Sequence, residues 1–183
     1  MQKKVEIPDG VTVGVEQGNL VVKGPKGEMR KSPKGVKVDI KDKEVILSSG
    51  SERRKEKAMV GTWSAHLRNM IIGVTQGWEA RLKTVYSHFP VKFNIEDEKV
   101  IIQNFMGERK PRTAKIVGDA KVDVKKDEVV ITGIDKDDVG QTAANIELTT
   151  KVKGYDRRVF QDGCHLIQKC KPIEESTEGE KNE

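Results

Sequence analysis

Two segments in the second half of the chain combine cations with turn residues, a composition that suits phosphate binding. The first spans residues 107–115 and carries Arg109, Lys110, Arg112 and Lys115. Lysine and arginine on irregular backbone can follow a row of phosphates, and arginine can hold one phosphate through two donors. An equally basic loop is expected at residues 27–35. A solvated loop that keeps a sheet soluble remains the alternative, but the recurrence of the pattern favours phosphate contact for at least one of the two loops.

The second segment, residues 151–163, mixes cations, two aromatic residues, an amide and two acids between glycines. Lys153 belongs to this segment. Such a mixture is typical of RNA surfaces, where arginine, amide and backbone groups contact phosphate, sugar and base edges. We expect Phe160 to lie in the core. Tyr155 can either stack on a base or close the end of a sheet, and the sequence leaves both open.

The residues give no positive indication of an enzyme. The three histidines, His66, His88 and His165, stand beside no protease motif, and no Gly-x-Ser-x-Gly elbow is present. The Gly-Pro-Lys-Gly run that starts at Gly24 lacks the length and ending of a phosphate-binding P-loop. Cys164, His165 and Cys170 do not have zinc-ligand spacing. We therefore expect no catalysis, no metal, no cofactor and no small-molecule substrate.

Charge is distributed unevenly over the 183 residues, whose formal net charge is +5. Residues 172–183 hold five acids and one base, and we expect this acidic, polar tail to be disordered. The remaining body holds 33 bases and 24 acids, an excess that points to an anionic partner such as nucleic acid. Ordinary surface lysine is the alternative that composition leaves open. No run of apolar residues is long enough to cross a membrane, and the start does not resemble a secretory signal.

An internal duplication organises the chain. Residues 11–28 match residues 91–108 without a gap, and residues 36–47 match residues 120–131. Each block alternates apolar and polar residues and predicts two half-buried strands joined by a turn.

Each copy then continues into a predicted helix. The apolar face of the first consists of Met59, Trp63, Leu67, Met70, Ile71 and Val74. The face of the second consists of Val139, Ala143, Ile146 and Thr150. Aspartates at the start of the second helix and lysines near its end complement the helix dipole, and Gly154 is the expected stop.

Together these patterns predict an α+β protein of two tandem duplicated domains. Each domain is expected to be a mostly antiparallel sheet with one helix packed on it. We place the domains at residues 1–81 and 82–171, followed by the tail at 172–183. The second domain carries more arginine in its loops and is expected to be the main RNA-binding domain.

Several motifs carry a family resemblance. Residues 139–147 (Val-Gly-Gln-Thr-Ala-Ala-Asn-Ile-Glu) and 156–163 (Asp-Arg-Arg-Val-Phe-Gln-Asp-Gly) resemble ribosomal protein six of the large subunit, in its archaeal and eukaryotic branch. Residues 86–90, residues 104–108 and the opening from Ile7 to Val11 are similar to that family as well, in the same order. The resemblance covers about residues 5 to 169.

The resemblance implies a structural constituent of the large ribosomal subunit that binds large-subunit rRNA, mainly through the second domain. It implies a place near the sarcin–ricin loop and the stalk base, where translational GTPases dock, with neighbouring ribosomal proteins as further partners and a cytoplasmic ribosome as the location. Carried over by similarity, the RNA-binding residues are Gln141, Asn145, Arg157, Arg158, Gln161, Asp162 and Gly163. The sequence departs from the family at Cys164 and His165, where an aliphatic and an aromatic residue are usual.

Two other functions stay open as alternatives. One is a duplicated protein–protein adaptor that uses its sheet edges, with basic loops that only maintain solubility. The other is an enzyme that uses a nucleotide.

Overall fold

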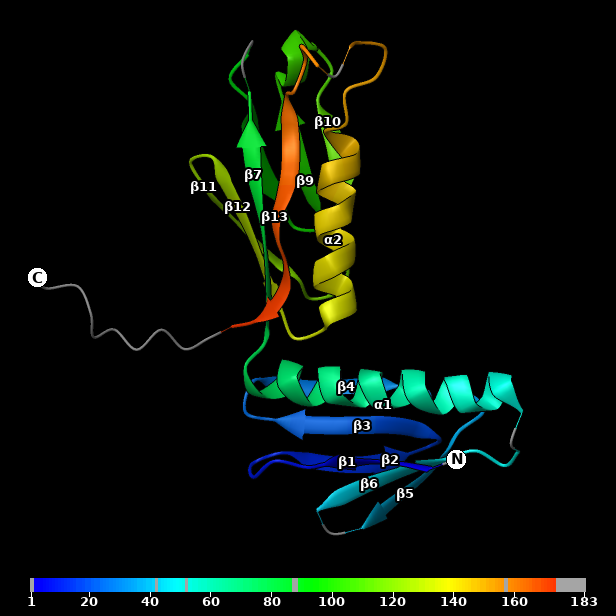
Figure 1. Cartoon of the computed structure of the whole chain (residues 1–183). Coiled ribbons are helices and arrows are strands. Elements are labelled where there is room, and N and C mark those ends of the chain that lie inside the picture. Colours follow the sequence, from blue (N-terminus) through cyan, green and yellow to red (C-terminus); the bar gives the residue numbers. More distant parts are fainter. Residues whose placement is uncertain (1, 42, 52, 87–88, 157, 174–183) are drawn as a thin grey trace, which may run out of the picture. The chain divides into compact units, whose positions relative to one another are not determined.

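The computed structural model describes residues 2–173 except for residues 42, 52, 87, 88 and 157 (Figure 1). The chain divides into two compact units, one that runs to Gly77 and one that spans Trp78–Ile173. Of the tail predicted to be disordered from residue 172, Pro172 is instead the last residue of a strand that pairs with Trp78. The tail from residue 174 onward lies outside the described residues.

Among its described residues, the first unit contains six strands and one helix, which form two antiparallel sheets of three strands and a covering helix. The sheet orders are β2-β3-β4 and β1-β6-β5. The elements are β1 (Gln2–Glu6), β2 (Thr12–Glu16), β3 (Asn19–Gly24), β4 (Gly27–Lys31), β5 (Lys37–Lys41), β6 (Glu44–Ser48) and α1 (Arg54–Thr75). The helix contacts both sheets, because strands β1, β3, β4 and β6 all lie against it.

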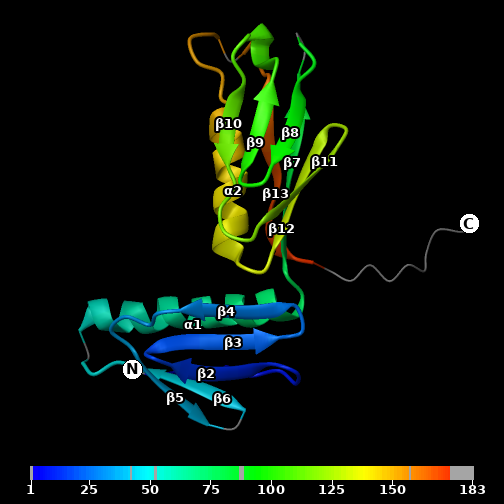
Figure 2. The same cartoon turned by 180° about the vertical axis from the view of Figure 1, so that it is seen from behind.

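The second unit repeats this order and adds one strand (Figure 2). Its sheets have the orders β10-β9-β8 and β11-β12-β7-β13. The elements are β7 (Trp78–Val85), β8 (Lys92–Glu96), β9 (Lys99–Gln103), the short helix η1 (Phe105–Gly107), β10 (Arg112–Lys115), β11 (Lys121–Lys125), β12 (Glu128–Gly133), α2 (Lys136–Thr149) and β13 (Gly163–Pro172). The predicted duplicated α+β fold is confirmed, although each unit has two sheets where the sequence suggested one.

The boundary between the units lies four residues before the one expected from the sequence. Strand β7 begins at Trp78 and pairs along its length with β12 and β13 of the second unit. Trp78, Ala80 and Leu82 alternate inward and are buried. Residues 78–81, which the sequence assigned to the first repeat, therefore belong to a sheet of the second unit, and Trp78 and Ala80 to its core.

Helix α1 is amphipathic, but its buried face is rotated slightly from the expected one. Leu67, Met70 and Val74 are buried as predicted, whereas the N-terminal part of the face is formed by Val60 and Ser64. Met59 and Trp63 are only half-buried. The reason is geometric, since Val60, Ser64, Leu67, Ile71 and Val74 follow the i, i+3, i+4 spacing of one helical face.

Helix α2 begins and ends with identifiable backbone contacts. The Asp135 carboxylate accepts a hydrogen bond from the Asp137 N–H at 2.9 Å and caps the N-terminus. The predicted face, Val139, Ala143, Ile146 and Thr150, is buried. The helix ends at Thr149 with Thr150 as its C-cap, so that Gly154, the expected stop, lies beyond it in a turn with φ of 80°.

No helix in the described part of the chain is long and apolar enough to cross a membrane.

Gly24 allows the closest approach between a strand and a helix in the first unit. A Cβ atom built at Gly24 would lie 2.6 Å from Val74 Cγ2 and 2.9 Å from the Val74 carbonyl oxygen. We predict that Gly24→Ala lowers the free energy of unfolding by about 1–3 kcal/mol, because the added methyl overpacks this contact.

The measurement is urea unfolding of the full chain. Gly14→Ala in strand β2 is the matched control, since a Cβ there meets nothing within 4 Å. Equal losses of unfolding free energy in the two variants would contradict the importance of the close contact between Gly24 and Val74.

Candidate nucleic-acid interface

The basic segment at residues 107–115 is only partly a loop. Arg112–Lys115 forms β10, which pairs with β9 and buries Ala114. The corresponding segment of the first unit is likewise a strand, β4, at Gly27–Lys31. In both cases an alternating inward residue, Ala114 or Met29, makes the segment a strand despite its cations. The true loop is short, and its Arg109 and Lys110 are exposed.

Arg112 is committed to contacts within the protein. Its Nε and Nη2 donate to the two Glu108 carboxylate oxygens at 2.8 and 2.5 Å. Its Nη1 donates to the carbonyl oxygens of Thr149 and Lys151 at 2.8 and 3.2 Å. The guanidinium also stacks over the Phe105 ring, 4.3 Å from its centre. Four of its five donors are therefore occupied, which makes Arg112 a positioning residue for the two basic segments.

Two amide residues of α2 form a second link between the helix and β10. The Gln141 side-chain amide donates to Asn145 Oδ1 at 3.0 Å, and the Asn145 amide donates to the Lys115 carbonyl oxygen at 2.9 Å. The Lys115 side chain is exposed beside them. Lys115, Gln141 and Asn145 thus form a lateral group along α2, apart from the end of the unit.

The segment between α2 and β13 folds into a turn stabilised by Asp156. The Asp156 carboxylate accepts from the Arg158 N–H at 2.9 Å, and its carbonyl oxygen accepts from the N–H groups of Val159 and Phe160. This turn holds Arg158 exposed. Arg157, the other arginine predicted here, lies outside the described residues.

Phe160 is not the core residue that the sequence suggested. It is half-buried, and its ring lies 4.8 Å from the ring of Tyr155. Tyr155 itself is 58% exposed. The two rings pack against each other in a tilted arrangement, because the turn brings them together at the surface. Tyr155 therefore presents an accessible aromatic face.

Asp162 and Gly163 connect this turn to β13 and are buried. A Cβ at Gly163 would lie 3.2 Å from the Thr150 carbonyl oxygen, and its φ of 154° is one that side chains rarely adopt. The Cys164 N–H donates to Thr150 Oγ1 at 3.0 Å. Gly163 is therefore needed for close approach of β13 to the end of α2, and it contributes no side chain to binding.

Cys164 and His165, where the sequence departs from the family, fit this packing. Burial raises the pKa of the Cys164 thiol, although contacts with Thr84 and Thr150 oppose this effect. Cys164 therefore acts as a small apolar residue in the core. His165 is exposed, and its Nε2 lies 3.2 Å from the Gln161 carbonyl oxygen.

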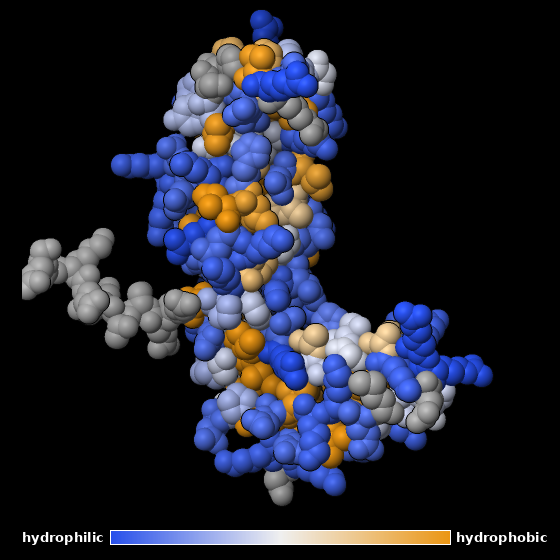
Figure 3. All heavy atoms as spheres, in the orientation of Figure 1, coloured by the Kyte–Doolittle hydropathy of each residue, from blue (hydrophilic) through white to orange (hydrophobic). Residues whose placement is uncertain are grey.

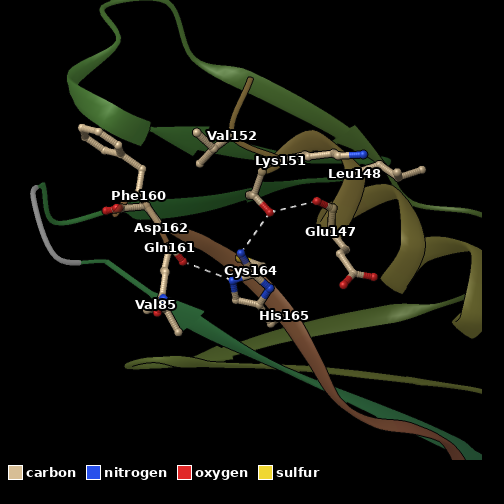
Figure 4. Close-up of a pocket in the computed structure, with 11 residues that line it drawn as sticks. Val85, Glu147, Leu148, Lys151, Val152, Phe160, Gln161, Asp162, Cys164 and His165 are labelled. Carbon is tan, nitrogen blue, oxygen red and sulfur yellow. Dashed lines mark hydrogen bonds between the residues drawn. The ribbon is translucent and has the colours of Figure 1, made fainter. Parts of the chain in front are cut away.

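A cavity of about 630 Å³ opens between the end of α2 and β13 (Figure 4). Val85, Leu148, Val152 and Phe160 form its apolar walls. Its polar lining comes from Glu147, Thr150, Lys151, Gln161, Asp162 and His165. Apolar walls with a few hydrogen-bonding groups suit a flat ring that carries amino groups, such as an unpaired base.

The two predicted basic segments meet at one end of the second unit. Arg112 joins them directly, because it bonds to Glu108 of one and to the Lys151 carbonyl of the other. In Figure 1 the η1–β10 loop and the segment after α2 lie at the same end of this unit. Among the described residues, the side chains of Arg109, Lys110, Lys153 and Arg158 form no ion pair. The two segments that Arg112 links thus carry four cations whose charge is uncompensated.

Comparison with known proteins decides the family. The family model of "Ribosomal protein L6" matches residues 7–77 and again residues 89–163. The chain belongs to the ribosomal protein L6 family. Each match lies within one of the two units, and the second ends at Gly163, immediately before the departure at Cys164. The resemblance seen in the sequence is confirmed, and a member of this family is a structural protein and not an enzyme.

Archaeal relatives are similar over almost their full length. The proteins named "Large ribosomal subunit protein uL6" of Methanosarcina mazei and Methanobrevibacter smithii are 47% and 52% identical to the chain. Each alignment covers 92% of this chain and 96–97% of the relative. The protein of Methanothrix thermoacetophila with the same name is 50% identical over 169 residues.

Sequence reasoning missed Glu108 and Lys151. Glu108 neutralises Arg112, and Lys151 supplies a backbone acceptor and lines the cavity. The opposite charges four residues apart, at Glu108 and Arg112, were the available signal for the first. No signal indicated the second, because a carbonyl oxygen has no sequence signature.

Arg112→Lys keeps the charge but removes the two-donor pair with Glu108 and the fixed fork that reaches two carbonyl oxygens. We predict a loss of roughly 1–3 kcal/mol in the free energy of unfolding, measured with urea. The control is Arg109→Lys, which should stay within about 0.5 kcal/mol of the original protein. A similar loss of unfolding free energy in both variants would contradict the role assigned to the Arg112 hydrogen bonds.

The ion pair between Glu108 and Arg112 predicts that the free energy of unfolding depends on pH. The hydrogen bond from Arg112 holds the pKa of Glu108 below its ordinary value of 4.5, although partial burial opposes the shift. A lowered carboxyl pKa gives stability that is present above the ordinary value and is lost as the pH falls through the lowered one. The difference in free energy of unfolding between the original protein and Glu108→Gln should therefore be constant near neutral pH and shrink in acid. A difference independent of pH would refute this.

Proposed function

We propose that this protein is a constituent of the large ribosomal subunit that binds large-subunit rRNA through the end of its second unit. The observation that carries the proposal is the convergence of the two basic segments on Arg112, with the charges of Arg109, Lys110, Lys153 and Arg158 left exposed. Membership of the ribosomal protein L6 family supports the choice of RNA over other anions.

Binding on this surface is electrostatic and depends on shape. The exposed cations neutralise phosphates where rRNA segments approach each other, and released counterions supply much of the binding free energy. Gln161 and the lateral group around Lys115 extend the surface, and the family resemblance adds Arg157 as a further RNA-binding residue. Asp162, Gly163 and Arg112 act by holding the backbone in place, as their burial and contacts indicate. Recognition of duplex parts then rests on shape and on 2′-hydroxyl groups.

The family resemblance supports a more specific location. We infer that the protein lies near the sarcin–ricin loop and the stalk base of a cytoplasmic ribosome, beside other ribosomal proteins, and supports the region where translational GTPases dock. The domain assignment belongs to this proposal, with the second unit as the main RNA-binding domain and the first in a supporting role.

Arg157→Ala combined with Arg158→Ala tests the site. We predict weaker rRNA binding with an unchanged circular dichroism spectrum and melting temperature, because the Arg158 side chain is exposed in its turn. In a filter-binding salt titration, the slope of log affinity against log salt should decrease by roughly two.

Lys121→Ala combined with Lys125→Ala on strand β11 removes the same charge elsewhere in the unit and serves as the control. Equal affinities of the arginine variant and the original protein would overturn the site. Purification with a stoichiometric protein partner and no RNA would favour the adaptor alternative.

A further inference from the structure

The first unit carries a second strongly basic surface that the proposed site does not use. Arg53, the residue before α1, and Arg54, Lys55, Lys57 and Arg68 within it stand against one acid, Glu56. These five cations are exposed. Among the described residues, none of their side chains forms an ion pair. Residues 53–76 thus carry a net charge of +4.

This charge opposes helix stability. Cations near a helix N-terminus face the positive end of the helix dipole, an effect of about 0.3–1 kcal/mol for each charge. No side chain caps the N-terminus of α1 either. The equivalent helix α2 has Asp135 as its cap and Asp137 and Asp138 in its first turn. Helix α2 therefore shows that this fold does not require cations in the first turn of its helix. Residues that oppose the stability of their own element in this way are typical of functional surfaces.

The outer face of α1 between its cations carries small side chains. Ala58, Gly61, Thr62 and Ala65 occupy the turns between Lys57 and Arg68, and the Lys3 amino group lies 3.9 Å from the position of a Cβ at Gly61. Arg54 and Arg68 are fourteen residues apart in the sequence, a distance of about 21 Å along the helix axis. Figure 3 shows hydrophilic side chains projecting from the end of the unit where α1 begins.

A helix face of small side chains with cations at both ends fits a paired RNA better than an unpaired one. Single strands are bound by exposed aromatic rings on which bases stack. Trp63, the aromatic residue nearest this face, is half-buried and its ring packs 5.5 Å from that of His66. The minor groove of duplex RNA is wide and shallow and is flanked by phosphates. Small residues can approach such a groove while the cations at either end reach the phosphates.

We propose that the exposed face of α1 binds double-stranded RNA, with Arg54, Lys57 and Arg68 on phosphates. This inference rests on the proposed function, because both take RNA as the partner. It assigns that partner to a different unit and a different surface. The protein then holds two RNA segments, one on each unit.

The test combines binding with stability in the full chain. The probes are a perfectly paired RNA hairpin of roughly 16 base pairs, the span typical of duplex-binding domains, and an unstructured RNA strand of equal length. The variant is Arg54→Glu combined with Lys57→Glu. Lys37→Glu combined with Lys41→Glu on strand β5 is the control, since it makes the same change in charge on exposed residues of the same unit.

We expect the α1 variant to lower the salt slope for the hairpin by roughly two, with weaker affinity, while the control leaves both nearly unchanged. The α1 variant should be as stable as the original protein or more stable, because acids replace cations at the N-terminus of the helix. Loss of binding therefore cannot arise from unfolding.

Three results would overturn the inference: equal effects of the two double variants, tighter binding of the single strand than of the hairpin, or a protein partner that the α1 variant loses while hairpin affinity persists. Repeating the titration in the Arg157→Ala, Arg158→Ala background separates the two sites. An effect of the α1 substitutions in that background supports the inference even if the second-unit arginines prove irrelevant. If instead the second-unit arginines matter and the α1 substitutions have no effect, only the α1 site is overturned.

Discussion

The RNA interface proposed for the second unit depends on one guanidinium group. Arg112 stands on a strand, so its backbone is fixed by pairing with β9, and its side chain reaches a carboxylate and two carbonyl oxygens. It thereby fixes the end of α2 relative to the loop that carries Arg109. Arg109 and Lys110 lie in the loop before β10, and the turn that carries Arg158 is held by Asp156. Arg112 links the two segments, because it satisfies backbone acceptors that the end of a helix leaves open.

Duplication supplied two similar frames, and the surfaces then diverged. Both units use a helix across two antiparallel sheets, with the same order of elements. The helix of the first unit is basic and uncapped, whereas that of the second is capped by Asp135 and carries acids in its first turn. In the second unit, the exposed cations of the proposed site lie instead in segments outside the helix. Because a core constrains only the inward face of a helix, the outward faces were free to acquire different binding properties.

Sequence patterns predicted the regular parts of this fold well. The alternating blocks gave the hairpins β2–β3 and β8–β9 closely, because one face of each is buried. They failed at β4 and β10, where cations and proline resemble a loop and only one inward residue, Met29 or Ala114, is buried. They also failed at Phe160, whose apolar character suggested a core position. Its ring instead lies against Tyr155 at the surface, a contact that depends on the Asp156 turn.

The sequence by itself determined the duplication, the fold class, the family and the identity of the cationic segments. Each of these follows from residue order and periodicity, which survive without coordinates. Only the tertiary structure decided which cations are available. Arg112 and Arg158 look alike in the sequence, yet one is neutralised by Glu108 and backbone carbonyls while the other is exposed. Glu108 is only four residues from Arg112. The carbonyl oxygens of Thr149 and Lys151, however, come from a segment nearly forty residues away, and folding alone brings them within hydrogen-bond distance of Arg112.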